Sequence, residues 1–135
     1  MVEDSPTDED CTFAPFEIIP FTVMGTTVGE NNSFDPGSAG CTGFAEPGAD
    51  LVYEVFLSAT TTYTVTMTPE TEGAVYIVTD CGAPTTTCVA GADGKTGALA
   101  QVLTYTPPSA GIYFIVVDGW LSTTESAFTL DVVGD

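Results

Sequence analysis

The feature that most restricts the fold of this chain is the alternation of apolar and polar residues in its short hydrophobic runs. In residues 63–67, Tyr, Val and Met alternate with Thr, and in residues 128–132 apolar residues alternate with Thr and Asp. Because successive side chains of a strand point to opposite faces of a sheet, this period of two predicts strands that bury one face. No window after Glu17 has the three- and four-residue spacing of an amphipathic helix, so we expect an all-β chain.

The boundaries of the strands are set by Gly, Pro, Asn and Asp residues between the runs, and the even spacing of the runs predicts a sandwich of two sheets. One run, residues 112–117, is apolar on both faces. This pattern is typical of a central strand covered on both sides, with an assembly contact as the alternative. The expected strands are residues 16–24, 26–29, 51–57, 60–68, 74–79, 88–90, 98–105, 111–117 and 127–133.

The charged residues exclude several classes of function. Nineteen acidic residues stand against one Lys, with no Arg or His, and give a net charge of −18. Without His the chain lacks an imidazole base and a His-bound metal. A single Lys cannot form a basic patch for nucleic acid or for an anionic membrane surface. Catalysis would need a pair of carboxylates, and no two are predicted to meet in a cleft, so we expect a non-catalytic protein that attracts cations.

The four cysteines include no CxxC pair, which favours structural disulfides in an oxidising compartment over a zinc site. We therefore expect a secreted, extracellular or cell-surface protein, and the absence of an apolar run near 18 residues predicts no membrane insertion. Four cysteines permit three pairings. The most economical joins Cys11 to Cys41, fastening the N-terminal segment, and Cys81 to Cys88, closing a short loop.

The chain divides into an acidic N-terminal tail or linker, residues 1–16, and one domain, residues 17–135. Six segments of this domain stand in the order typical of the bacterial pre-peptidase C-terminal domain, and the chain resembles the form common in myxobacteria. These segments are PFTVMGTTVGENNSFDPG, GADLVYEVFL, AVYIVTDCG, CVAGADG, LTYTPPSAGIYFIVVDGW and SAFTLDVV. The resemblance implies a jelly-roll-like, two-sheet antiparallel β-sandwich. It also implies a non-catalytic module that often follows secreted hydrolases, with calcium bound near the start of the domain in some relatives.

A calcium site is predicted from residues that offer oxygen ligands within a short span. Calcium takes six to eight oxygens, and a Gly-bounded loop rich in Glu, Asn and Asp supplies them. The predicted ligands are Glu30, Asn31, Asn32, Asp35 and Asp50. The alternative is that these residues only form turns, as Asn and Asp often do. Asp118, before Gly119, is interpreted as a turn residue, with cation binding as its alternative.

Two non-enzymatic functions remain open. One is an accessory module that holds a polysaccharide or protein near a parent hydrolase, with Trp120 and Tyr113 as candidate ligand platforms. For Trp120 the favoured interpretation is a cap on the sandwich edge, and the ligand platform is the alternative. The other is a structural subunit of a cell-surface polymer or filament. For that function, the apolar residues 13–23, with Pro15 and Pro20, suit a strand that pairs with a neighbouring copy.

Overall fold

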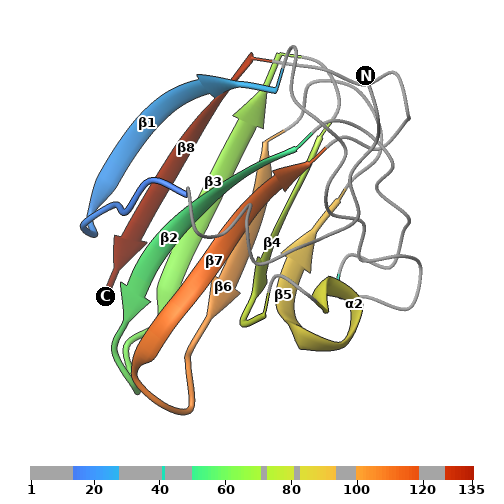
Figure 1. Cartoon of the computed structure of the whole chain (residues 1–135). Coiled ribbons are helices and arrows are strands. Elements are labelled where there is room, and N and C mark those ends of the chain that lie inside the picture. Colours follow the sequence, from blue (N-terminus) through green and yellow to red (C-terminus); the bar gives the residue numbers. More distant parts are fainter. Residues whose placement is uncertain are drawn as a thin grey trace.

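The computed structural model describes residues 14–27, 41, 50–70, 73–80, 83–93, 100–118 and 127–135. Its elements in chain order are β1 (Phe21–Thr26), β2 (Leu51–Leu57), β3 (Tyr63–Pro69), β4 (Ala74–Val78), α2 (Pro84–Thr87), β5 (Cys88–Ala92), β6 (Gln101–Tyr105), β7 (Gly111–Asp118) and β8 (Ala127–Gly134). The strands form two four-stranded antiparallel sheets that face each other (Figure 1). The β1 sheet has the order β1–β8–β3–β6, and the β2 sheet has the order β2–β7–β4–β5. The expected two-sheet antiparallel sandwich is confirmed.

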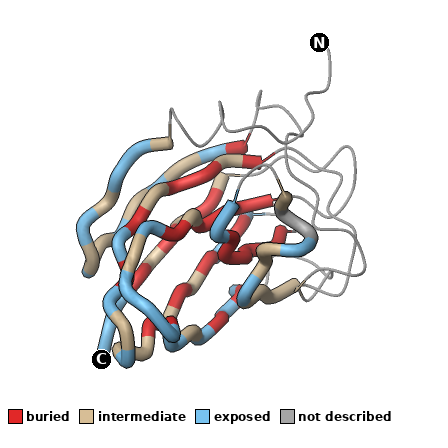
Figure 2. Tube along the Cα trace, turned by 60° about the horizontal axis from the view of Figure 1, so that its bottom comes forward, coloured by how far each residue is buried: buried red, intermediate tan, exposed pale blue. Residues whose placement is uncertain are grey.

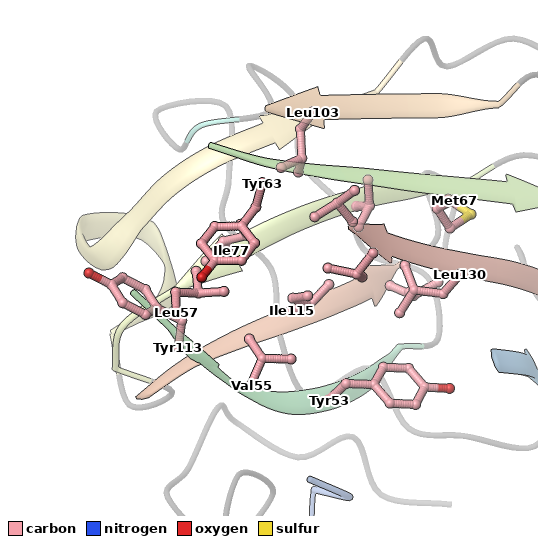
Figure 3. Close-up of a cluster of buried hydrophobic side chains, with 14 of the residues drawn as sticks. Tyr53, Val55, Leu57, Tyr63, Met67, Ile77, Leu103, Tyr113, Ile115 and Leu130 are labelled. Atoms are coloured by element: carbon pink, nitrogen blue, oxygen red, sulfur yellow. The ribbon is translucent and has the colours of Figure 1, made fainter. Parts of the chain in front are cut away.

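The main core lies between the sheets and is built from the residues that alternate along the strands (Figure 3). Along β3, Tyr63, Val65 and Met67 are buried, whereas Thr64 and Thr66 between them are only half-buried. The same alternation of buried and more exposed residues runs along β6 and the first six residues of β8, and stretches of alternating colour are visible in Figure 2. The predicted core residues of β2, β3 and β8 are confirmed. The central members of the cluster are Tyr53, Val55, Leu57, Tyr63, Val65, Met67, Ile77, Leu103, Tyr113, Ile115, Phe128, Leu130 and Val132.

A second, smaller cluster lies on the outer face of the β2 sheet. It consists of Val52, Tyr76, Val78 and Val116, with Ala14, Cys41, Cys88 and Phe114 packed against it. The central strand β7 is therefore covered on both faces over its second half, as its continuous apolar run predicts. The outer face of the first half of β7 is not covered in this way, and Ile112 on that face is 44% exposed.

The N-terminal strand differs from the expectation. Residues 16–24 do not form one strand, since β1 begins at Phe21 and only Phe16 upstream makes a bridge, in parallel with Glu54 of β2. The N–H of Glu17 donates to the carbonyl of Glu54 at 3.0 Å, and the N–H of Glu54 donates to the carbonyl of Pro15 at 2.9 Å. Proline has no N–H for a ladder, which explains why Pro15 and Pro20 bracket this short contact.

Residues 14–20, which we call the crossing segment, thus pass from the edge of the β2 sheet to the edge of the β1 sheet. There β1 pairs with β8, from Phe21 opposite Val132 to Thr26 opposite Ala127. One continuous stretch of chain consequently lines both sheet edges on this side of the sandwich (Figure 1).

Smaller differences concern the starts of two strands. The expected strand 60–68 begins at Tyr63, because Thr60 has a φ of 68° and belongs to the turn that follows β2. The strand expected over 98–105 is observed from Gln101. Thr26 ends β1 and does not begin a separate strand.

In the described residues no helix is long and apolar enough to cross a membrane.

Candidate functional site

Two aspartates are buried at one end of the β2 sheet. Asp118 is the last residue of β7 and is 2% exposed, and Asp50 immediately precedes β2 and is 5% exposed. The register pairs Leu51 with Val117, so continuing it by one residue places Asp50 level with Asp118. Residues that face each other across an antiparallel pair point to the same side of the sheet. Alternation from Val116 puts both carboxylates on the outer face, at the end of the second cluster.

Tyr76 of β4 holds one of these carboxylates. Its hydroxyl donates to Asp118 Oδ2 at 2.7 Å, and Tyr76 is completely buried. A buried carboxylate is stable only if hydrogen bonds or an opposite charge replace its lost hydration, and a second carboxylate nearby raises the cost. The arrangement of Asp50 beside Asp118 therefore places two carboxylates where little hydration is available, at this end of the sandwich.

The structure brings together only part of the predicted calcium site. Asp50 lies at the strand end described above, whereas Glu30, Asn31, Asn32 and Asp35 lie outside the described residues. Among the residues that are described, no three acidic, Cys or His side chains gather closely enough to hold a metal ion.

Asp118 is the addition that the structure makes to the predicted set. It is a strand residue rather than a turn residue, and its hydrogen-bond partner lies 42 positions away in the sequence. The sequence does contain a signal for the burial of Asp118, because this residue follows a fully apolar strand. A carboxylate in such a place needs hydrogen bonds or an opposite charge to replace its lost hydration.

The cysteine pairing differs from the expectation. Cys41 forms a disulfide with Cys88, with their Cα atoms 5.5 Å apart, so the expected pairing of Cys41 with Cys11 and of Cys88 with Cys81 is wrong. The physical reason is burial: both sulfurs pack against the second cluster, where the outer face of the β2 sheet needs cover. Cys11 and Cys81 lie outside the described residues.

The two aromatic residues predicted as ligand platforms have different outcomes. Tyr113 is 6% exposed; its ring packs edge-on against Tyr105, with centroids 5.8 Å apart, and its hydroxyl donates to the carbonyl of Ser109 at 3.0 Å. A side chain buried in this way presents no ring face to a ligand, so Tyr113 is a core residue. Trp120 lies outside the described residues.

Comparison with known proteins supports the fold class. No protein-family model matches the chain, and no curated protein matches it. Among solved structures, the fold is similar to that of the pre-peptidase C-terminal domain of a collagenase from Bacillus anthracis, with a TM-score of 0.60. The match covers 88% of this chain and 93% of that chain at 12% sequence identity.

The architecture is therefore a β-sandwich like that of a pre-peptidase C-terminal domain. At 12% identity the likeness concerns the fold alone, and it does not extend to the myxobacterial form of the family.

Proposed function

We propose that this chain is a secreted, non-catalytic β-sandwich module that acts as an extracellular structural or interaction protein and is stabilised by calcium. The observation that carries the proposal is the burial of Asp50 and Asp118 side by side in a chain of net charge −18. Two adjacent buried carboxylates repel each other, a bound cation relieves this repulsion, and calcium is the common extracellular cation with oxygen ligands. The disulfide between Cys41 and Cys88 supports an oxidising compartment.

In this proposal Asp50 and Asp118 supply ligands from the strand ends. Glu30, Asn31, Asn32 and Asp35 supply the remaining side-chain oxygens from the sequence between β1 and β2. The hydroxyl of Tyr76 donates to Oδ2 of Asp118 and so orients this carboxylate at the end of β7.

A thermal melt tests the calcium site. Extracellular modules bind calcium with dissociation constants of about 0.1–1 mM, so ~1 mM calcium would add about 0.4–1.4 kcal/mol by mass action. The midpoint should rise by about 1–6 °C over a chelated sample. Asp50→Asn and Asp118→Asn should each remove most of this rise.

Asp131→Asn is the matched control, because it makes the same charge change on the outer face of the β1 sheet, where Asp131 accepts a hydrogen bond from Thr22 at 2.6 Å. It should leave the calcium-dependent rise intact. A melt that is the same in chelator and in millimolar calcium would exclude the site.

Two roles are compatible with such a module. The likeness in fold to a domain of a collagenase supports an accessory module, which holds a substrate or carbohydrate near an exported hydrolase. A structural subunit of a surface polymer is supported by the peripheral position of β1, in which no residue is fully buried. Because β1 pairs with β8 of its own chain, polymerisation through β1 would require exchange of this strand between copies.

Gel filtration and electron microscopy of the full chain in calcium separate these roles. A discrete monomer at all concentrations favours the accessory module. Ordered polymers that dissolve in chelator favour the subunit.

A further inference from the structure

A groove with a mixed lining of apolar and polar residues lies at the end of the sandwich opposite to Asp50 and Asp118. Its volume is about 370 Å³. One wall is the crossing segment, and the other side is formed by the end of β2, the start of β3 and the last residues of the chain. Phe56 and Tyr63 line it, and the hydroxyl of Tyr63 accepts a hydrogen bond from the N–H of Ser58 at 2.8 Å, which fixes this part of the groove.

The groove continues onto an exposed apolar row on the outer face of the β2 sheet. Phe56 pairs directly with Ile112, and the parallel bridge of Phe16 to Glu54 places Ile18 level with Phe56. The exposed fractions are 52% for Phe16, 77% for Ile18, 50% for Phe56 and 44% for Ile112. We call these four residues, together with the groove, the Phe56 surface. Apolar side chains that are exposed together, rather than singly, mark interaction sites.

The charge around the Phe56 surface is entirely negative. Glu17 and Asp135 line the groove. Glu54 lies between Phe16 and its cross-strand partner Phe114. Every charged side chain among the described residues is acidic, because the chain's one Lys falls outside them. A second copy of this chain would bring like charge against like, whereas a cationic partner would be attracted.

We propose that the Phe56 surface binds an extended segment of another protein in which Lys or Arg side chains alternate with apolar side chains. The apolar side chains would enter the groove and cover Ile18 and Phe56, and the cationic ones would reach Glu17 and Asp135. An extended segment fits because alternate side chains of a strand point to opposite sides, so the apolar face meets Ile18 and Phe56, and the long cationic side chains of the other face bend back to Glu17 and Asp135.

The backbone of the crossing segment favours the same conformation. The carbonyl of Pro15 and the N–H of Glu17 both form hydrogen bonds with the backbone of Glu54 in β2. Backbone groups of successive strand residues point alternately to the two sides, so those of Phe16 point away from β2 and toward a ligand laid along the segment. Pro15 and Pro20 limit this edge to a few residues, which suits a short peptide better than a long sheet.

Fluorescence anisotropy with a labelled, capped nonapeptide of alternating Leu and Lys tests the proposal on the intact protein in calcium. Phe56→Ser and Ile18→Ser should each weaken binding about tenfold, because they remove apolar contact area. The control is Met24→Ser, which removes an apolar side chain that is 82% exposed on the outer face of the β1 sheet. It should leave the affinity unchanged.

The charge requirement is tested with two substitutions of equal charge. Glu17→Gln should weaken binding about threefold, and Glu70→Gln, at the opposite end of β3, should not. A peptide of alternating Ser and Lys should bind at least about tenfold more weakly than the Leu–Lys peptide.

Two results would overturn the proposal. One is equal weakening by Glu17→Gln and Glu70→Gln, which indicates unspecific attraction to the acidic chain. The other is binding that Phe56→Ser does not change. Neither result affects the calcium proposal, because the Phe56 surface shares no residue with the Asp50–Asp118 end.

Discussion

The hydroxyl of Tyr76 and the carboxylate of Asp118 form a 2.7 Å hydrogen bond between two residues that are almost completely buried. Neither group has ready access to water, so the loss of the tyrosine hydroxyl removes a hydrogen bond that replaces part of the hydration of the buried carboxylate. Tyr76→Phe should therefore lower the free energy of unfolding by about 1–3 kcal/mol. Urea denaturation in chelator measures this change without a contribution from calcium.

The comparison variant is Tyr113→Phe, which removes a hydroxyl donated to the carbonyl of Ser109. That bond joins neutral groups near the surface, so its loss should cost about 0.5–1.5 kcal/mol. If Tyr76→Phe costs no more than Tyr113→Phe, the hydrogen bond to Asp118 is not a significant source of stability.

The disulfide between Cys41 and Cys88 predicts both a peptide map and a stability change. Non-reducing mapping should recover the Cys41–Cys88 pair, and the two remaining cysteines, Cys11 and Cys81, should be linked to each other. The pair spans 47 positions, for which the chain-entropy estimate is about 4 kcal/mol. The double substitution Cys41→Ser and Cys88→Ser should lower the free energy of unfolding by up to that amount. Recovery of Cys81 linked to Cys88 would contradict the structure.

Two glycines in strands provide a test of packing at the sheet edge. A Cβ added at Gly25 of β1 would lie 2.8 Å from Phe128 Cζ and 2.8 Å from the hydroxyl oxygen of Tyr53. At Gly111 an added Cβ would meet nothing within 4 Å. Gly25→Ala should destabilise the protein by about 1–3 kcal/mol, and Gly111→Ala should be neutral or stabilise it by about 0.4–1 kcal/mol. Equal midpoints for the two variants in urea would show that β1 does not approach the core this closely.

Deprotonation of Tyr105 is expected to lower the free energy of unfolding at alkaline pH. Burial, a hydrogen bond with Tyr113 and the charge interaction with Tyr113 raise the pKa of Tyr105 from 10.0 to about 12. The folded state therefore holds this proton more tightly than the unfolded state. Its contribution to stability is fully present below pH 10 and is lost as the pH rises from 10 to about 12.

The measurement is the difference in unfolding free energy between the native chain and Tyr105→Phe as a function of pH. The difference should shrink between pH 10 and about 12. A difference that stays constant over this range would contradict a raised pKa.

The sequence predicted the elements in which local alternation and burial agree. For β2 the boundaries Leu51 and Leu57 are as expected, and Tyr53, Val55 and Leu57 are core residues. Here the period of two indicates which face is buried in the main core, because the strand is bounded by turn residues and Glu54 marks the other face.

The errors arise where two distant parts of the chain decide the outcome. The apolar residues of the crossing segment have strand-like composition, yet Ile18 is 77% exposed, since Pro20 ends one contact before β1 begins the next. The wrong prediction that Cys88 pairs with Cys81 was based on the short loop between them. Loop length carries no information on the outer face of the β2 sheet, where Cys41 lies. Likewise, the sequence gives no sign that Tyr76 meets Asp118, because that contact depends on how β4 pairs with β7.

The pairing of β1 with β8 also determines how the module responds to tension. Phe21, where β1 begins, lies opposite Val132, near the end of β8, so the start of β1 and the end of β8 lie at the same end of the β1 sheet (Figure 1). In a Cys11→Ser and Cys81→Ser variant, in which no disulfide upstream of β1 carries the load, a pull on these two strand ends would first break the two hydrogen bonds of the crossing segment to β2 and then open the β1–β8 ladder one pair at a time. The six residues of β1 would release about 20 Å of chain at low force. The β2 sheet, held by the Cys41–Cys88 disulfide, would remain folded.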